Sequence, residues 1–243
     1  MDLFPAIDIR GGRCVRLHQG DYAQETEYGD DPVAQALQFA DAGAAWIHVV
    51  DLDAARDGEA VNREVVAAIA SAVDVPVQAG GGVRTISAAE ALFDAGVARV
   101  VIGTAALAAP GLVRGLAAVH PVAVGLDARS GEVVTDGWTR RSGRSVLDSA
   151  AEFADAGVEA FVVTDVGRDG TLAGPDVSGL TEVLEATTVD VIASGGVSSI
   201  DDLRVLRDID VAGRRLTGAI VGKAIYEGRF GVEQAVAAIA EKP

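Results

Sequence analysis

The sequence predicts a (β/α)8 barrel, in which eight parallel strands are each followed by a helix. Short apolar runs of strand length alternate eight times with amphipathic helical stripes along the 243 residues. The chain also has the length of one such barrel. An open, doubly wound sheet is the alternative fold, but eight evenly spaced parallel strands favour closure. We therefore expect a single barrel over residues 1–243, with its site on the carboxyl-terminal rim.

An internal repeat is the second observation that supports this fold. Four short patterns recur in the same order, two of them 114 residues later and two of them 119 residues later. They are Phe39–Gly43 with Phe153–Gly157, Gly81–Val83 with Gly195–Val197, Asp8 with Asp127, and Gly103 with Gly222. Four ordered matches indicate two related half-barrels of four units each, approximately 1–119 and 120–243.

The strands are expected where the apolar runs lie, and the helices where the stripes have helical spacing. The expected strands are 3–9, 46–51, 75–79, 99–102, 121–127, 160–164, 189–193 and 217–221. The expected helices are 32–42, 61–72, 110–118 and 176–186, others opening at Ser87, Ser145 and Ser199, and a last one around 232–239. Loops are expected from the first strand to about Asp31, and around 136–138.

Capping residues support several of these helix starts. Asp31 before Pro32 combines an N-cap with the residue favoured at the first helical position. The patterns Ser87–Glu90 and Ser199–Asp202 both have the spacing of a capping box. These signals place helix starts directly after the loops that follow the strands.

The composition excludes several classes of function. The 36 acidic residues outnumber the 20 basic ones and give a net charge of −16, which disfavours nucleic acid and anionic membranes as partners. No long uncharged apolar run predicts a membrane span or a signal peptide. Cys14 is the single cysteine, which fits a reducing cytoplasm, and the three histidines lie too far apart in sequence to suggest a metal site. We expect no metal, no cofactor and no obligate protein partner.

Glycine clusters follow four of the expected strands, in two pairs. The first pair comprises Gly80, Gly81 and Gly82 with Gly103 and Thr104, and the second comprises Gly195 and Gly196 with Gly222 and Lys223. Glycine lets the backbone approach a ligand closely, and unpaired backbone N–H groups bind phosphate. The second pair follows strands seven and eight, where barrels commonly bind phosphate. Tight turns are the alternative interpretation, but two sites across one mouth predict a small molecule with a phosphate at each end.

Two aspartates end apolar strands at corresponding places in the repeat. Asp8 ends the first strand and Asp127 the fifth, where a carboxylate adds nothing to packing and is costly to desolvate. One proton acceptor and one donor flanking the reacting carbons would make an acid/base pair. A structural role in binding loop amides is the alternative for either residue alone.

Other polar residues are expected near this pair. Thr164 ends the sixth strand and is expected to hydrogen-bond the substrate or an aspartate, and Arg16 is placed to reach a phosphate or a carboxylate. Asp169 with Gly170 is either part of the site or a plain turn. Trp138 is expected to be exposed in its loop and to stack on a flat heterocycle.

With these residues in view, the chain resembles a family of histidine biosynthesis over essentially its whole length: the phosphoribosylformimino-5-aminoimidazole carboxamide ribotide (ProFAR) isomerases. The motifs are Pro5–Ile9, Gly12–Leu17, Gly80–Arg84, Gly125–Asp127, Thr164 with Asp169–Thr171, Ser194–Ser198 and Ile220–Lys223. The resemblance implies an Amadori rearrangement of the aminoaldose ProFAR to the aminoketose PRFAR, a bisphosphate, without cofactor. It also implies Asp8 as proton acceptor at sugar C2, Asp127 as the acid that helps open the ring, and Thr164 as their support.

Details of the chain look closest to the actinobacterial branch of that family, of which some members also isomerise phosphoribosyl anthranilate. Those members carry arginine where this chain has Asp136 before Gly137 and Trp138, and an aspartate there would repel the anthranilate carboxylate. Arg140 or Arg141 is the possible substitute, so dual substrate use stays as the alternative. The sibling cyclase of the pathway has a different first-strand motif, and a dedicated phosphoribosylanthranilate isomerase would place a cysteine six residues before Cys14. A non-catalytic phosphoribosyl-binding barrel would require a lost acid.

Overall fold

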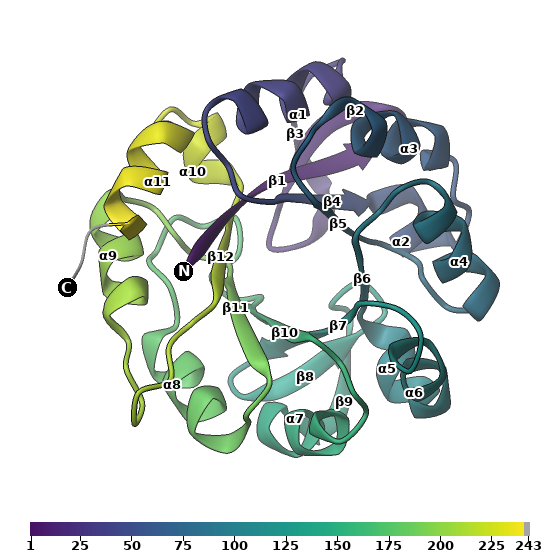
Figure 1. Cartoon of the computed structure of the whole chain (residues 1–243), viewed down its shortest axis with the longest axis vertical. Helices are drawn as coiled ribbons and strands as arrows, with labels where there is room; N and C mark the ends of the chain where they lie inside the picture. The colour runs from purple at the N-terminus through teal and green to yellow at the C-terminus, as the bar shows by residue number, and fades with distance from the viewer. Residues whose placement is uncertain (241–243) are drawn as a thin grey trace.

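Eight parallel strands form a closed barrel in the computed structural model, which describes residues 1–240 (Figure 1). The barrel strands are β1 (Asp2–Arg10), β4 (Ile47–Asp51), β5 (Val77–Gly80), β6 (Arg99–Ile102), β7 (Val122–Arg129), β10 (Ala160–Asp165), β11 (Asp190–Ser194) and β12 (Gly218–Val221). Each strand pairs in parallel with its two neighbours, and the pairings β1–β12 and β7–β10 leave no open edge. The predicted barrel is confirmed, and the open sheet is wrong.

Helices surround the barrel in the ring that Figure 1 shows. The outer helices are α1 (Pro32–Asp41), α3 (Arg63–Ala72), α4 (Ile86–Asp94), α6 (Pro110–Ala117), α7 (Val146–Ala154), α8 (Val177–Ala186), α9 (Ile200–Asp208) and α11 (Val232–Ala240). Three short helices that the sequence did not predict follow strands at the rim: α2 (Leu52–Asp57), α5 (Thr104–Ala108) and α10 (Lys223–Tyr226). They are too short to show a helical stripe of apolar residues.

The predicted caps are confirmed with one exception. The Asp31 side chain accepts hydrogen bonds from the first turn of α1, and Ser199 with Asp202 forms a complete capping box on α9. Ser145 caps α7 as expected. The prediction at Ser87 is wrong, because Thr85 is the N-cap of α4 and its hydroxyl accepts from the Ala88 amide.

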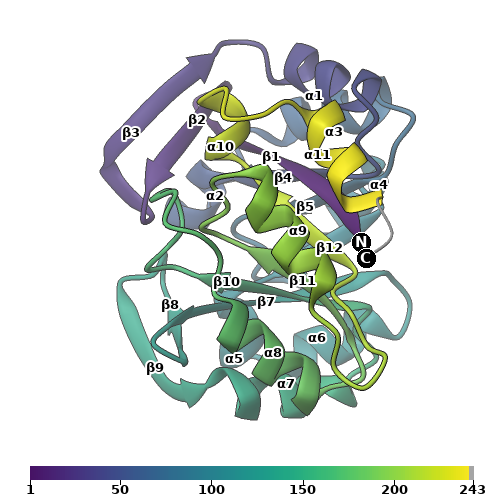
Figure 2. The ribbon, with the colours of Figure 1, turned by 90° about the vertical axis from the view of Figure 1, so that its left-hand side faces the viewer.

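Two β-hairpins stand where loops were expected. The first consists of β2 (Arg13–His18) and β3 (Asp21–Gly29), and the second of β8 (Glu132–Thr135) and β9 (Arg140–Ser145). They extend β1 and β7 through antiparallel pairing, and Figure 2 shows both at the same end of the barrel. The sequence missed them because β3 and β9 are largely polar and contain no buried residue, so neither shows the alternation that marks a half-buried strand.

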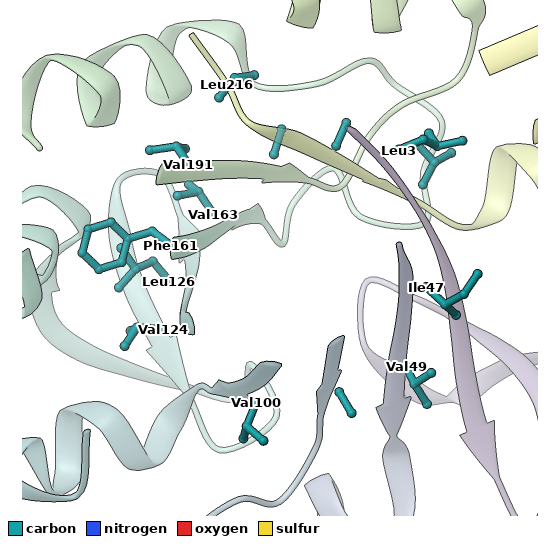
Figure 3. Close-up of a cluster of buried hydrophobic side chains, with 14 of the residues drawn as sticks. Leu3, Ile47, Val49, Val100, Val124, Leu126, Phe161, Val163, Val191 and Leu216 are labelled. Atoms are coloured by element: carbon teal, nitrogen blue, oxygen red, sulfur yellow. The ribbon is translucent and has the colours of Figure 1, made fainter. Parts of the chain in front are cut away.

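The core lies on both sides of the barrel wall. Alternate strand residues point outward into a cluster against the helices, part of which Figure 3 shows around Leu126, Phe161 and Val191. The other residues point inward, and a second cluster including Phe4, Ala6 and Ile220 fills the interior. Burial on both faces explains why the strands read as near-continuous apolar runs. It also places the inward-pointing residue near the end of each strand at the mouth of the barrel.

Candidate active site

The carboxyl-terminal rim carries Asp8 and Asp127 at equivalent places. Asp8 lies level with Val50 on the neighbouring strand β4, and Asp127 lies level with Thr164 on β10. Both carboxyls line one cavity of about 250 Å³ in the barrel mouth. The repeat therefore places two acids in the same space, as the sequence predicted.

The structure brings the other predicted residues to the same mouth. The main cavity is also lined by Arg16, Gly80, Gly81, Gly82, Gly103, Thr104, Trp138, Thr164 and Asp169. A smaller cavity is lined by Gly170, Gly195, Gly196, Gly222 and Lys223, together with Arg16 and Asp169. Because Arg16 and Asp169 line both spaces, the two cavities are adjacent. The first glycine pair opens on the main cavity and the second pair on the smaller one.

Asp8 faces the cavity with only 13% of its side chain exposed. An Arg16 Nη1 lies 2.9 Å from its Oδ2. Burial raises the pKa of Asp8 to about 6, against the opposing effect of the Arg16 charge and with a further increase from Asp169. A carboxyl with this pKa is ionised at neutral pH and is a stronger base than an exposed aspartate.

Arg16 reaches the site from strand β2 of the first hairpin. Its guanidinium packs over Gly222, where an added Cβ would lie 2.3 Å from Arg16 Cζ. The Arg16 Nε has no hydrogen-bond partner among the described residues, although the atom is buried. Arg16 thus lies between Asp8 and the smaller cavity, as a cation available to both.

Asp127 has a different set of neighbours. The Trp138 indole Nε1 donates to Asp127 Oδ2 at 2.8 Å, and the Thr164 hydroxyl also hydrogen-bonds this carboxyl. Burial raises the pKa of Asp127, and the two side-chain hydrogen bonds act in the opposite direction. Thr164 therefore contacts an aspartate, which is one of the two roles expected for it.

Trp138 is half-buried, so the expectation of an exposed side chain is wrong. It lies in the β8–β9 turn, where Asp136, Gly137 and Trp138 have φ of 55°, 64° and 69°. This left-handed turn directs the indole across the mouth onto Gly20, where an added Cβ would lie 2.4 Å from the ring. The indole thereby connects the tips of the two hairpins above the cavity.

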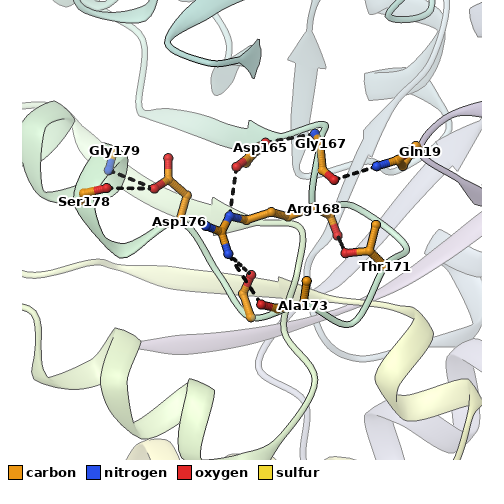
Figure 4. A network of polar contacts seen from close by, with 10 residues as sticks. Gln19, Asp165, Gly167, Arg168, Thr171, Ala173, Asp176, Ser178 and Gly179 are labelled. Carbon is orange, nitrogen blue, oxygen red and sulfur yellow. Dashed lines mark hydrogen bonds and ion pairs between the residues drawn. The ribbon is translucent and has the colours of Figure 1, made fainter.

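Asp169 is a third carboxyl in the site, and the sequence had left it between a site residue and a turn. Burial raises its pKa, and the charge of Arg16 lowers it. Its loop is rigidly held: Arg168 Nε donates to Asp165 at 3.1 Å, and its Nη1 donates to the Gly174 carbonyl at 3.2 Å (Figure 4). The backbone N–H of Gln19, in the turn of the first hairpin, also donates to the Asp169 carbonyl at 3.2 Å. An Asp-Gly pair predicts an exposed turn, so the burial of the Asp169 carboxyl could not be predicted from the sequence.

Gly82 and Gly196 occupy equivalent turns in the two halves. Their φ values are 67° and 86°, and a Cβ would lie 2.2 Å from the carbonyl oxygen of Ala54 or Gly174 respectively. Only glycine fits such positions. These turns lead into α4 and α9, and Gly82 lines the main cavity while Gly196 lines the smaller one.

Two further polar residues of the cavity were not predicted to act there. Arg84 lines it beside the first glycine cluster, and its Nη2 donates to the Ala55 carbonyl at 3.0 Å. His48 on β4 also lines the cavity. Each position carries a signal in the sequence: Arg84 lies two residues after the glycine cluster, and His48 interrupts an apolar strand.

Among residues 1–240, no group of three or more histidine, cysteine, aspartate or glutamate side chains is placed to hold a metal ion. None of the helices in that part of the chain is long and apolar enough to cross a membrane. Cys14 is buried, and burial raises the pKa of its thiol to about 11, so it is protonated at neutral pH.

A closed barrel with buried acids and glycine turns on its carboxyl-terminal rim defines a (β/α)8-barrel enzyme, because active sites of this fold occupy that rim. The comparisons specify the family. Residues 2–231 match the family described as "Histidine biosynthesis protein", and the chain belongs to that family.

Three relatives share one name, 1-(5-phosphoribosyl)-5-((5-phosphoribosylamino)methylideneamino)imidazole-4-carboxamide isomerase. The protein of Rhodospirillum rubrum is 50% identical over 99% of this chain and all of the relative. The protein of Synechococcus sp. strain CC9902 is 49% identical over 99% of this chain and 94% of the relative. The protein of Geobacillus thermodenitrificans is 47% identical over 99% of this chain and 98% of the relative. The resemblance drawn from the motifs is confirmed.

Proposed function

We propose that the protein is a ProFAR isomerase of histidine biosynthesis, which converts an aminoaldose into the corresponding aminoketose. The observation that carries this proposal is the placement of Asp8 and Asp127 in one cavity, with a glycine cluster on either side. The full-length similarity to isomerases of that name supports it. As a biosynthetic enzyme of this kind, it would act in the cytoplasm.

The substrate would span the mouth with one phosphate at each glycine pair. Gly80–Gly82, Gly103 and Thr104 would receive one phosphate, with Arg84 as the nearby cation. The turns at Gly195, Gly196 and Gly222 would receive the other, with Lys223 and Arg16 close by. Local amides and these cations would bind an anion despite the net charge of −16. The reacting sugar then lies between the two clusters, beside the acids.

Asp8 would act as the base. Protonation of the ring oxygen opens the furanose and leaves a Schiff base at C1. Removal of the C2 proton by Asp8 then gives an enolamine, and protonation at C1 with loss of the proton from the C2 hydroxyl yields the aminoketose. The pKa of about 6 suits this role, since Asp8 is ionised at neutral pH yet retains basicity. Arg16 would hold the carboxylate in place and balance its charge.

Asp127 is our assignment for the acid that helps open the ring, with Thr164 orienting it. Asp169 is a second candidate, because its pKa is also raised by burial and it faces Asp8 closely enough to raise the pKa of that group. Hydrogen bonds from Trp138 and Thr164 favour the ionised form of Asp127, which is unfavourable for an acid. Comparing Asp127→Asn with Asp169→Asn tests the assignment: the residue that supplies the proton is the one whose loss removes the alkaline limb of the pH–rate profile.

Steady-state kinetics on ProFAR and on phosphoribosyl anthranilate, side by side, test the function itself. We expect turnover of ProFAR and no turnover of the anthranilate compound. The Asp136 carboxylate lines the cavity and would repel the anthranilate carboxylate. Arg140 Nε lies 3.5 Å from Asp136 Oδ2, but its side chain is largely exposed, so it would offset this repulsion only weakly. Absence of ProFAR turnover by folded protein would refute the proposal, and turnover of both substrates would establish the dual-specificity alternative.

A further inference from the structure

A row of three polar side chains crosses the barrel interior beneath the first acid. His48 on β4, Gln78 on β5 and Arg99 on β6 are register partners, with Gln78 between the other two. Gln78 Nε2 lies 2.9 Å from His48 Nδ1, and Arg99 Nε lies 2.7 Å from Gln78 Oε1. All three are buried, with exposed fractions of 7%, 0% and 7% respectively. Such a row is costly to bury unless its members are paired.

The chemistry of the row sets the direction of each hydrogen bond. A guanidinium can only donate, so the Gln78 oxygen must face Arg99. The Gln78 amide nitrogen therefore faces His48, and since it too only donates, Nδ1 of His48 must be the acceptor. A neutral imidazole that accepts at Nδ1 carries its proton on Nε2. Burial, followed by the charges of Arg16 and Arg99, lowers the pKa of His48 to about 3, so the ring is neutral.

Arg99 is itself held firmly at the far end of the row. Its guanidinium lies 4.4 Å from the Trp46 ring centroid and 5.7 Å from that of Phe4. The Glu159 carboxylate is 3.7 Å away and balances its charge. These contacts fix the donor that orients Gln78. His48 lies at the other end, where it lines the cavity that holds Asp8.

The second half of the barrel shows that the fold does not need this row. The repeat offsets of 114 and 119 residues bring His48, Gln78 and Arg99 to Val162, Ile192 and Gly218. Those three positions are buried and apolar, and the space above Gly218 is filled by Phe4. The first half thus buries three polar side chains where the second half has ordinary apolar packing. Because the fold does not require this row, we take it to serve the site.

We propose that Gln78 and Arg99 are positioning residues that hold His48 as the Nε2–H tautomer, so that it presents a fixed hydrogen-bond donor to an oxygen atom of the substrate beside Asp8. This inference rests on the proposed function for the identity of the substrate. The donor would contact an uncharged acceptor, a sugar hydroxyl or a carboxamide oxygen, between the two phosphate sites. The tautomer itself is a property of the free protein.

Nitrogen-15 NMR of protein labelled at histidine tests the tautomer without any substrate. The chain has three histidines, and the His48 signals are identified by their loss in His48→Gln. We expect an unprotonated Nδ1 and a protonated Nε2, unchanged from pH 8 to pH 5. In Gln78→Glu, the carboxylate accepts instead of donating, so Nδ1 should gain a proton. A proton on Nδ1 in the wild type, or an unchanged Nδ1 in Gln78→Glu, would overturn the proposal.

Kinetics on ProFAR test what the row contributes. In Gln78→Met the directing donor is lost at similar volume, and we expect kcat/KM to fall about tenfold, as for one lost hydrogen bond. The matched control is Val77→Ala, a buried neighbour that points out of the barrel and whose kcat/KM should stay within twofold. Unchanged kinetics in a folded Gln78→Met variant, or an equal loss in Val77→Ala, would refute the positioning role. If wild-type protein does not turn over ProFAR, the proposed function fails, while the NMR result still decides the tautomer.

Discussion

The two halves of the barrel share one frame and differ in what surrounds the acid of each. In both halves an extended strand carries the aspartate, continues into a hairpin and is followed by a glycine turn and a second glycine before a short helix. Asp8 forms an ion pair with Arg16, whereas Asp127 accepts hydrogen bonds from two neutral donors, Trp138 and Thr164. The residue level with Asp8 is Val50, which donates nothing.

This difference shows how a repeated frame acquires two chemical roles. The ion pair with Arg16 lowers the pKa of Asp8, and it involves only one carboxylate oxygen, Oδ2. The other oxygen is therefore free to accept a proton. Two neutral donors hold the geometry of Asp127 instead. Two carboxyls in unlike surroundings can divide acid and base work between them. The predictions that follow test this division, beginning with the largest effect.

Removing either carboxylate should have the largest effect. We expect kcat on ProFAR to fall by about 10³-fold in Asp8→Asn and by about 10²-fold or more in Asp127→Asn, within the range for loss of a general acid or base. Affinity for the bisphosphate, measured by calorimetry, should change little because the glycine turns are intact. Asp201→Asn, at an 86% exposed side chain, is the control and should retain full activity. Near-normal kcat in Asp8→Asn would make the base assignment wrong.

Replacing Gly222 by alanine should lower kcat/KM much more than the same replacement at its counterpart Gly103. In Gly222→Ala the new methyl group would overlap the Arg16 guanidinium, whereas Gly103→Ala meets no atom within 4 Å. Displacing Arg16 removes charged hydrogen bonds, so we expect kcat/KM to fall by roughly 10- to 100-fold. Gly103→Ala should lose severalfold at most. Equal losses in steady-state assays of the two variants would show that Arg16 has no special role.

The barrel and the place of the acids could be predicted from the sequence because one physical rule governs both. Strands buried on both faces are apolar, so Asp8 and Asp127 stand out at their ends, and parallel strands bring these ends to one rim. The glycine pairs could be predicted as well, because their position directly after a strand is a local feature of the sequence.

The rest depended on contacts between distant segments. The β2–β3 hairpin is polar, so its pairing has no periodic signal, although it delivers Arg16 to Asp8. Trp138 reaches Gly20 because of a left-handed turn that sequence patterns do not specify. Asp169 reads as a turn residue, and its depth comes from the Arg168 network of its loop. Gln78 is a single polar residue in an apolar strand, and the sequence does not show that it hydrogen-bonds His48 and Arg99 on the neighbouring strands.

Removing the indole donor should have a smaller effect than removing a carboxylate. Trp138→Phe keeps the ring over Gly20 but loses the 2.8 Å hydrogen bond to Asp127. The pKa of Asp127 should then rise, because a donor that favours its ionised form is gone. Because this donor also holds the carboxyl in position, we expect kcat/KM to fall about tenfold despite the higher pKa, as for one lost charge-assisted hydrogen bond. Thr164→Val removes the other donor and should act in the same direction; an unchanged pH–rate profile in both variants would contradict the prediction.

The smallest expected effect comes from giving the first acid a neighbour like that of the second. Because Asp8 must be ionised to act as a base, kcat/KM of the wild type should fall tenfold per pH unit below about pH 6, the pKa of Asp8. In Val50→Thr, a hydroxyl would stand level with Asp8 as Thr164 stands level with Asp127.

That hydroxyl would donate to the ionised carboxylate and lower the pKa of Asp8, because a hydrogen bond to the charged form favours it. The acid limb of the pH–rate profile should therefore move to lower pH, by about half a unit to one unit, while kcat at pH 8 changes by less than about threefold. Thr164→Val is the reciprocal control and should leave this acid limb in place, since Thr164 affects the pKa of Asp127 and not that of Asp8. A limb that stays near pH 6 in Val50→Thr, or moves in Thr164→Val, would mean that Asp8 does not set the acid limb, and the division of roles between the halves would have to be reversed.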